Sequence, residues 1–146
     1  MTRFRRRALA IGATLTFFVG GTAESATTIK GAAILDNPCG KVSVKQMGLM
    51  HAGKFEDANK LTTKEMQDQW KSAPAKDRAM MMDMAREMSQ TEADYTADIK
   101  SGGVLMIDGA SATLTVQKKT KDANGTSTST MTQNFKLSGS ECLVGR

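Results

Sequence analysis

Residues 103–119, "GVLMIDGASATLTVQKK", form two runs rich in apolar and β-branched residues on either side of a turn. In the second run Leu114 and Val116 alternate with polar neighbours, which is typical of a strand with one face toward a core and one toward water. The intervening "DGAS" at 108–111 has the composition of a turn. The segment therefore predicts two antiparallel strands whose inner faces are buried.

The same period of two continues in both directions from this segment. "YTADIK" at 95–100 and "STMTQNFKL" at 129–137 read as further strands, and "KDANG" at 121–125 contains the Asn-Gly pair that accepts positive φ in a tight hairpin. The inward residues of the last strand are expected to be Met131, Phe135 and Leu137. The chain from Tyr95 onward is thus predicted to be an antiparallel sheet.

Residues 41–90 follow a helical period instead. The predicted inward stripe consists of Val44, Met47, Met50, Phe55, Ala58 and Leu61. Gly53 is expected to end a first helix, a hydroxyl of Thr62 or Thr63 to cap a later one, and Ser72 with Pro74 to open a helix that runs through Met88. Three or four helices followed by strands predict an α+β domain, with the helices on one face of a curved antiparallel sheet.

The first 25 residues have the pattern of a secretory signal peptide. Arg3, Arg5, Arg6 and Arg7 precede the uncharged apolar run "ALAIGATLTFFVGG", which is too short to span a bilayer easily. Small residues offer cleavage after Ser25 or before Glu24, and we favour the cut after Ser25. A twin-arginine signal is the alternative to the general secretory route. We therefore predict a signal peptide at 1–25, a single domain at 26–146 and a periplasmic location.

Cleavage changes the charge of the protein. The whole chain carries a formal net charge of +5, and loss of residues 1–25, with four arginines and one glutamate, lowers it to +2. Lysines and acidic residues are interleaved along residues 41–100 without a basic block. This pattern gives no support for a nucleic-acid or anionic-lipid partner.

Two cysteines, Cys39 and Cys142, lie near the two ends of the predicted domain. Export takes them into an oxidising compartment, so we expect a structural disulfide between them. A bridge that closes a loop of about 100 residues constrains the unfolded chain by up to about 4.7 kcal/mol. A free reactive thiol is the alternative.

The run "VKQMGLMHAGKFEDANKLTT" at 44–63 resembles the small exported bacterial members of the nuclear-transport-factor-2-like, or cystatin-like, superfamily. The resemblance extends over residues 40–138. It implies a cone-like fold in which the sheet wraps around helices, sometimes with a pocket and often as a homodimer. Many exported members are domains of unknown function. No set of positions here matches the catalytic sites of the superfamily's enzymes.

The chain has few residues for catalysis. His51 is the only histidine, and no catalytic serine motif accompanies it, so a hydrolase triad is not expected. Asp94 and Asp98 flank Tyr95 and would share a strand face as an acid/base pair, although such acids more often keep a sheet edge soluble. No phosphate loop, zinc spacing or calcium loop is present, and we predict that the protein is not an enzyme.

The segment "AMMMDMAREM" at 79–88 holds five of the eleven methionines. On a helix Met80, Met84 and Met88 form a stripe, with Met81 close to it. We expect this stripe to pack against the sheet or in a partner's groove, since methionine is an adaptable core residue. The alternative is a Cu(I) site made of Met80, Met81, Met84, Met88 and His51. Met82 points away from the stripe and is the candidate for a protein-binding surface.

Three function classes follow from these observations. We favour a noncatalytic binding protein of the periplasm, for example an immunity protein that binds a toxin, because the chain is small, exported and disulfide-linked. A periplasmic copper protein is the alternative. A small-ligand-binding or isomerase-like cone domain is the third.

Overall fold

The computed structural model describes residues 25–146. The signal peptide predicted for residues 1–25 therefore lies, apart from Ser25, outside the described residues. The helices are η1 (Gly31–Asp36, a 3-10 helix), α1 (Pro38–His51), α2 (Phe55–Asn59), α3 (Lys64–Ser72), α4 (Ala75–Met88) and α5 (Glu92–Gly102). The strands are β1 (Thr27–Lys30), β2 (Gly103–Asp108), β3 (Ser111–Asp122), β4 (Gly125–Ser138) and β5 (Glu141–Gly145).

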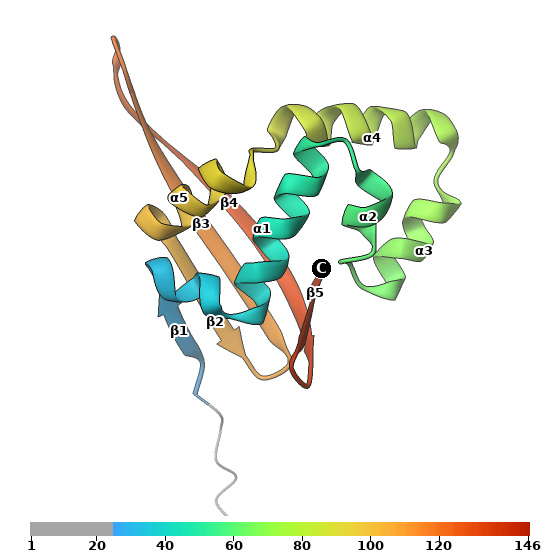
Figure 1. Ribbon diagram of the computed structural model, residues 1–146, viewed down its shortest axis with the longest axis horizontal. Helices are drawn as coiled ribbons and strands as arrows, with labels where there is room; N and C mark the ends of the chain where they lie inside the picture. The colour runs from blue at the N-terminus through green and yellow to red at the C-terminus, as the bar shows by residue number, and fades with distance from the viewer. Residues whose placement is uncertain (1–24) are drawn as a thin grey trace, which may run out of the picture.

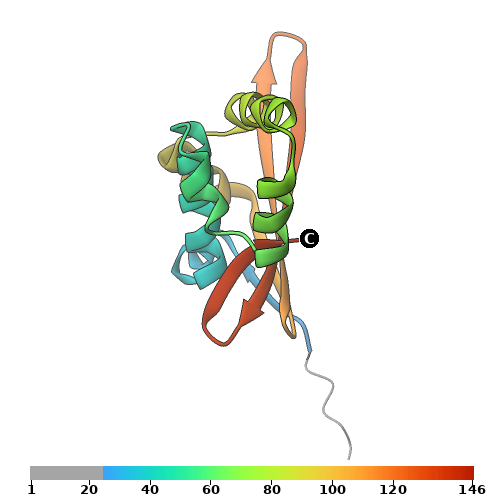
Figure 2. The same ribbon diagram turned by 90° about the vertical axis from the view of Figure 1, so that its right-hand side faces the viewer.

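The strands form one curved antiparallel sheet in the order β1-β2-β3-β4-β5, and the helices lie against one face of it (Figures 1 and 2). The predicted α+β class, with helices on one face of a curved and unclosed sheet, is confirmed. Helices α1 and α5 lie directly over the sheet, whereas α4 runs across the far end of α1 (Figure 1).

The core lies between α1, α5 and the inner face of the sheet. Its largest fully buried side chains include Tyr95 and Ile99 of α5, Leu114 of β3 and Phe135 of β4. Leu105 of β2 pairs with Leu114, so alternate residues of neighbouring strands point to the same side. The buried positions predicted for β3 and for Phe135 are confirmed, while Met131 and Leu137 are only partly buried around them.

The prediction of a strand at 95–100 is wrong, because these residues belong to α5. Thr91 begins the helix by accepting a hydrogen bond from the Asp94 backbone N–H at 3.1 Å. Tyr95 and Ile99, one helical turn apart, then face the core together. Tyr, Thr and Ile resemble a strand in composition, but their burial follows the spacing of a helix.

The sequence patterns do not predict β1 and β5. β1 pairs with β2 over four residues, and β5 pairs with β4 from Asn134–Gly145 to Ser138–Glu141. Both strands lie at the edges of the sheet. Each is too short for its own period to be distinguished from that of a loop.

The predicted end of the first helix is confirmed, because Gly53 has a φ of 73° directly after the last turn of α1. The predicted capping hydroxyl at the start of α3 is wrong. Thr63 makes no capping hydrogen bond, and the hydroxyl of Thr62 donates to the Asn59 carbonyl at 2.7 Å. The Ser72 and Pro74 region does open a helix, but α4 begins at Ala75.

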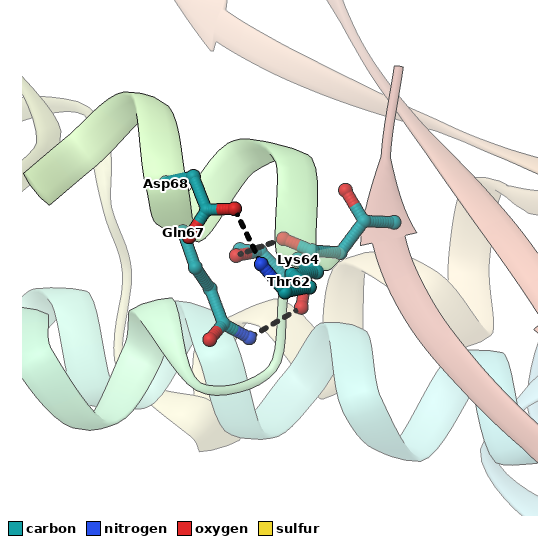
Figure 3. Close-up of polar contacts among 5 residues, drawn as sticks. Thr62, Lys64, Gln67 and Asp68 are labelled. Carbon is teal, nitrogen blue, oxygen red and sulfur yellow. Dashed lines mark hydrogen bonds and ion pairs between the residues drawn. The ribbon is translucent and has the colours of Figure 1, made fainter. Parts of the chain in front are cut away.

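The turn into α3 is held by polar contacts among its own residues (Figure 3), and backbone hydrogen bonds join it to β5. The Gln67 amide donates to the Thr62 carbonyl at 2.9 Å, and Lys64 pairs with Asp68 at 2.7 Å. The Thr63 N–H donates to the Val144 carbonyl at 2.8 Å, and the Val144 N–H donates to the Leu61 carbonyl at 2.9 Å. This turn therefore covers the outer edge of β5.

The predicted disulfide is confirmed. Cys39 in the first turn of α1 bonds Cys142 of β5, with the two Cα atoms 5.1 Å apart and both side chains buried. The bridge spans a sequence separation of 103 residues. It ties the first helix of the core to the last strand of the sheet.

Candidate functional site

α4 is the helix that carries the methionines, and it contains no buried residue. Arg78, Met82 and Ala85 are its half-buried positions and recur at intervals of four and three, so they define the side that faces the rest of the protein. The helix begins after Pro74, which suits a first turn, and ends before Ser89. α4 is therefore an amphipathic helix attached to the protein by a narrow inner side.

Four methionines of α4 are exposed to solvent. The exposed fractions are 60% for Met80, 40% for Met81, 54% for Met84 and 70% for Met88. At 100° per residue these positions fall within about 100° of arc around the helix axis. We call this sector the methionine face. An apolar sector of this width is what a helix normally turns toward a core.

The prediction that the methionine stripe packs against the sheet is wrong. The sheet face is already covered by α1 and α5, and the connection after α3 carries α4 over the end of α1 instead (Figures 1 and 2). Met82 is also placed differently from its prediction, because it is half-buried on the inner side of α4. Its role in binding a partner stays a prediction.

Beneath α4 lies a small apolar hollow. It is lined by Met81 and Met82 of α4, Met50 of α1, Phe55 of α2 and Trp70 of α3, among others. Its volume of about 160 Å³ is below the range of about 300–1,000 Å³ that drug-sized ligands need. The hollow marks loose packing between α4 and the helices below it.

Two polar contacts help to hold this helical layer together. The guanidinium of Arg86 lies over the Phe55 ring, 5.9 Å from its centre, as in a cation–π contact. The Trp70 indole N–H donates to the Glu56 carboxylate at 3.2 Å. Both contacts join α2 to the α3–α4 pair on the surface of the protein.

A chain of hydrogen bonds crosses the interior between α5, α1 and β4. The Ser43 hydroxyl donates to the side-chain carbonyl of Gln133 and lies 3.0 Å from the Tyr95 hydroxyl. The Gln133 amide donates to the Gln46 side chain at 2.6 Å, and the Gln46 amide reaches the Ala58 carbonyl at 3.5 Å. Each buried polar group is thereby paired, as a buried network requires.

Tyr95 is the titratable residue in this chain of hydrogen bonds. Burial raises the pKa of its hydroxyl above the usual value near 10, and Asp98 acts in the same direction, while the contact with Ser43 opposes both. The hydroxyl therefore stays protonated at neutral pH. Ser43 has tyrosine and glutamine neighbours rather than a general base, so this chain is suited to fixing the helices rather than to nucleophilic chemistry.

The two acids near Tyr95 have separate roles. The Asp94 carboxylate accepts a hydrogen bond from the Thr91 hydroxyl at 2.9 Å in the first turn of α5. Asp98 lies 3.5 Å from the Lys118 ammonium across the groove between α5 and β3. The expected shared strand face is absent because both lie on a helix, and each carboxylate has its own structural partner.

The residues of the copper alternative are distributed over two helices. Met80, Met81, Met84 and Met88 are exposed on α4, and His51 is exposed at the last position of α1. Within residues 25–146, no group of three or more His, Cys, Asp or Glu side chains is arranged to hold a metal ion. Any metal site on α4 would thus depend on thioethers.

No protein-family model, curated protein or solved structure matches this chain. The resemblance to the nuclear-transport-factor-2-like superfamily therefore stays a prediction. The α+β fold is compatible with it. Over the part of the chain that the structure describes, no helix is long and apolar enough to cross a membrane. The class established by the fold is a small, disulfide-linked α+β domain.

Proposed function

We propose that this protein is an exported, noncatalytic binding protein that recognises a protein partner through the methionine face of α4. The single observation that carries the proposal is the exposure of all four side chains of that face on a helix without a buried residue. Exposed contiguous apolar surface on a soluble domain marks an interaction site, and methionine adapts its shape to a partner.

The charges of α4 indicate how such a partner would be recognised. Lys76, Arg78 and Arg86 balance Asp77, Asp83 and Glu87, so the helix has no net charge. Recognition would then depend on the fit of apolar side chains into a groove rather than on steering by charge. The methionine face would enter that groove as a helix does, through positions one turn apart.

Export of the protein is part of the same proposal. The disulfide between Cys39 and Cys142 is typical of an oxidising compartment, and the first 25 residues have the pattern of a signal peptide. Small exported domains of this kind are suited to neutralising a toxin, so an immunity protein is a specific version of the proposal. Its support is size, compartment and an exposed apolar helix.

Partner capture with matched variants tests this proposal. The triple variant Met80→Gln, Met84→Gln, Met88→Gln keeps side-chain length but makes the face polar, and we expect it to lose the protein that the wild type retains from a periplasmic extract. Met106→Gln is the control, because Met106 is 51% exposed on β2 and not on α4. Retention of the partner by the triple variant, or its loss from the control, would count against the proposal.

Cu(I) binding is the second candidate, and it is favoured by the same exposure. Met80 and Met84, and Met84 and Met88, are one helical turn apart with their thioethers free to move toward a shared soft cation. Changing these three residues to leucine keeps the face apolar and removes the sulfur. Loss of Cu(I) in a competition titration with retention of the protein partner would separate the two functions.

A further inference from the structure

The hairpin formed by β3 and β4 extends beyond the body of the sheet. β2 ends its pairing with β3 at Val116, and β5 ends its pairing with β4 at Asn134. The remaining residues of the hairpin, 117–122 and 125–130, pair only with each other. The ribbon projects past the helices (Figures 1 and 2), and residues 117–130 are all exposed. A two-stranded ribbon without a covered face is only marginally stable in water, so folding stability alone does not explain the length of this hairpin.

The direction of the backbone groups along this ribbon follows from its register. The pairing is unbroken from Ser111–Lys136 to Asp122–Gly125, and the Leu137 N–H donates to the Ala110 carbonyl on the β3 side. Since bonding alternates along an antiparallel strand, the odd-numbered residues of β4 bond toward β3. The N–H and C=O groups of Thr126, Thr128 and Thr130 therefore point to the free side of β4.

The opposite edge of the same ribbon has different side chains. The residues across the ladder from these threonines are Lys121, Lys119 and Gln117, whose backbone groups point to the free side of β3. Lysines on an exposed edge repel a second identical edge and are a usual protection against strand addition. β4 lacks this protection, because residues 125–135 contain neither a charge nor a proline.

The other edges of the sheet are short or covered. β1 has four residues and ends in Lys30, while the outer side of β5 is bonded to the turn at 61–63. Among the described strands, the long free edge of β4 therefore differs from the others, because it has no charge and no proline and no other segment covers it. β-branched threonine at alternate positions further favours pairing of this segment with another strand.

We propose that the free edge of β4 pairs antiparallel with the same edge of a second copy of this chain. Antiparallel pairing of identical strands is self-complementary about a two-fold axis, as a closed dimer requires. With the axis at Thr128, its N–H and C=O bond those of Thr128 in the second copy, and Thr126 pairs with Thr130 on either side. Thr–Thr cross-strand pairs are favourable, and the absence of charge leaves no like-charge contact. Met88 of the methionine face and Thr130 line one hollow, and Thr128 at the proposed axis lies outside it.

Sedimentation velocity over a range of concentrations tests the pairing. We expect the purified protein to show a reversible monomer–dimer equilibrium. Thr128→Pro removes an outward N–H without removing a hydrogen bond of the hairpin, and it should raise the dimer dissociation constant by about tenfold or more. Lys119→Pro is the matched control, since it removes the outward N–H at the paired position on the β3 edge and should leave the dimer unchanged.

Charged substitutions at Thr128 provide a second test that remains valid if proline disturbs the ribbon. Thr128→Glu and Thr128→Lys should each be monomeric, because like charges would meet at the axis, and an equimolar mixture should form a mixed dimer. A wild type that is monomeric at every concentration would overturn the proposal, as would a dimer that persists in Thr128→Pro or is lost in Lys119→Pro. Amide exchange that slows at Thr126, Thr128 and Thr130 on dimerisation would support it.

Discussion

α1 and α4 are both fourteen-residue helices, yet they relate to the core in opposite ways. α1 buries five residues, among them Cys39, Ser43 and Met47, and α4 buries none. α1 lies over the sheet, whereas α4 lies over α1 and its neighbours (Figure 1). The apolar side of α4 is therefore not needed to close the core and stays exposed to solvent.

The largest effect on stability is expected where α1 and α5 pack on the sheet. Phe135→Ala would leave a cavity at the centre of that contact, and we expect the free energy of unfolding to fall by about 3–5 kcal/mol. Urea unfolding followed by circular dichroism measures it. A loss below about 1 kcal/mol would show that the core is not centred there.

The disulfide gives the next largest expected effect, because it links α1 and not α4 to the sheet. The double variant Cys39→Ser, Cys142→Ser should lose about 2–5 kcal/mol of unfolding free energy. Wild-type protein treated with reductant is the control and should show a similar loss. Equal stability of oxidised and reduced protein would contradict the structural role of the bridge.

Ser43→Ala tests the buried polar chain on the inner side of α1. It leaves Gln133 and the Tyr95 hydroxyl without their shared partner, so we expect a loss of about 1–3 kcal/mol in the free energy of unfolding. Ser43→Thr retains the hydroxyl and serves as a control for the size of the site. An unchanged urea midpoint for Ser43→Ala would show that water replaces the hydroxyl.

The free energy of unfolding should depend on pH because Tyr95 is buried. Its pKa is raised in the folded protein, chiefly by burial, so the unfolded chain releases this proton first as the pH rises. The contribution to stability is complete below about pH 10 and is lost as the pH rises through the higher folded pKa. Tyr95→Phe should flatten the fall in stability above pH 10 measured by urea unfolding, and an unchanged slope would contradict this assignment.

The smallest effect is expected on the methionine face. Met84→Gln should change the free energy of unfolding by no more than about 0.5 kcal/mol, since the side chain is exposed on a helix without buried residues. Met47→Gln on α1 is the contrasting variant and should cost several times more, because Met47 is buried. Similar losses for the two variants would remove the distinction between the helices.

Local patterns in the sequence predict the α+β class, most helix positions, three of the strands and the pairing of the cysteines. These follow from local causes: the period of apolar residues, turn residues such as those at 108–111, and a cysteine pair that the predicted export would bring into an oxidising compartment. Leu114 and Phe135 were predicted to be buried because alternation along a strand specifies which side chains share a face.

Which helices cover the sheet could not be predicted from the sequence, because it depends on how the elements assemble. The methionines of 80–88 have the spacing of a core stripe, but a stripe specifies that side chains share a direction and not what they face. α1 and α5 occupy the sheet, and the path of the chain through α3 places α4 elsewhere (Figure 2). Likewise, the exposed edge of β4 arises because β2 and β5 are shorter than the hairpin, and strand length relative to neighbours is a property of the assembled sheet.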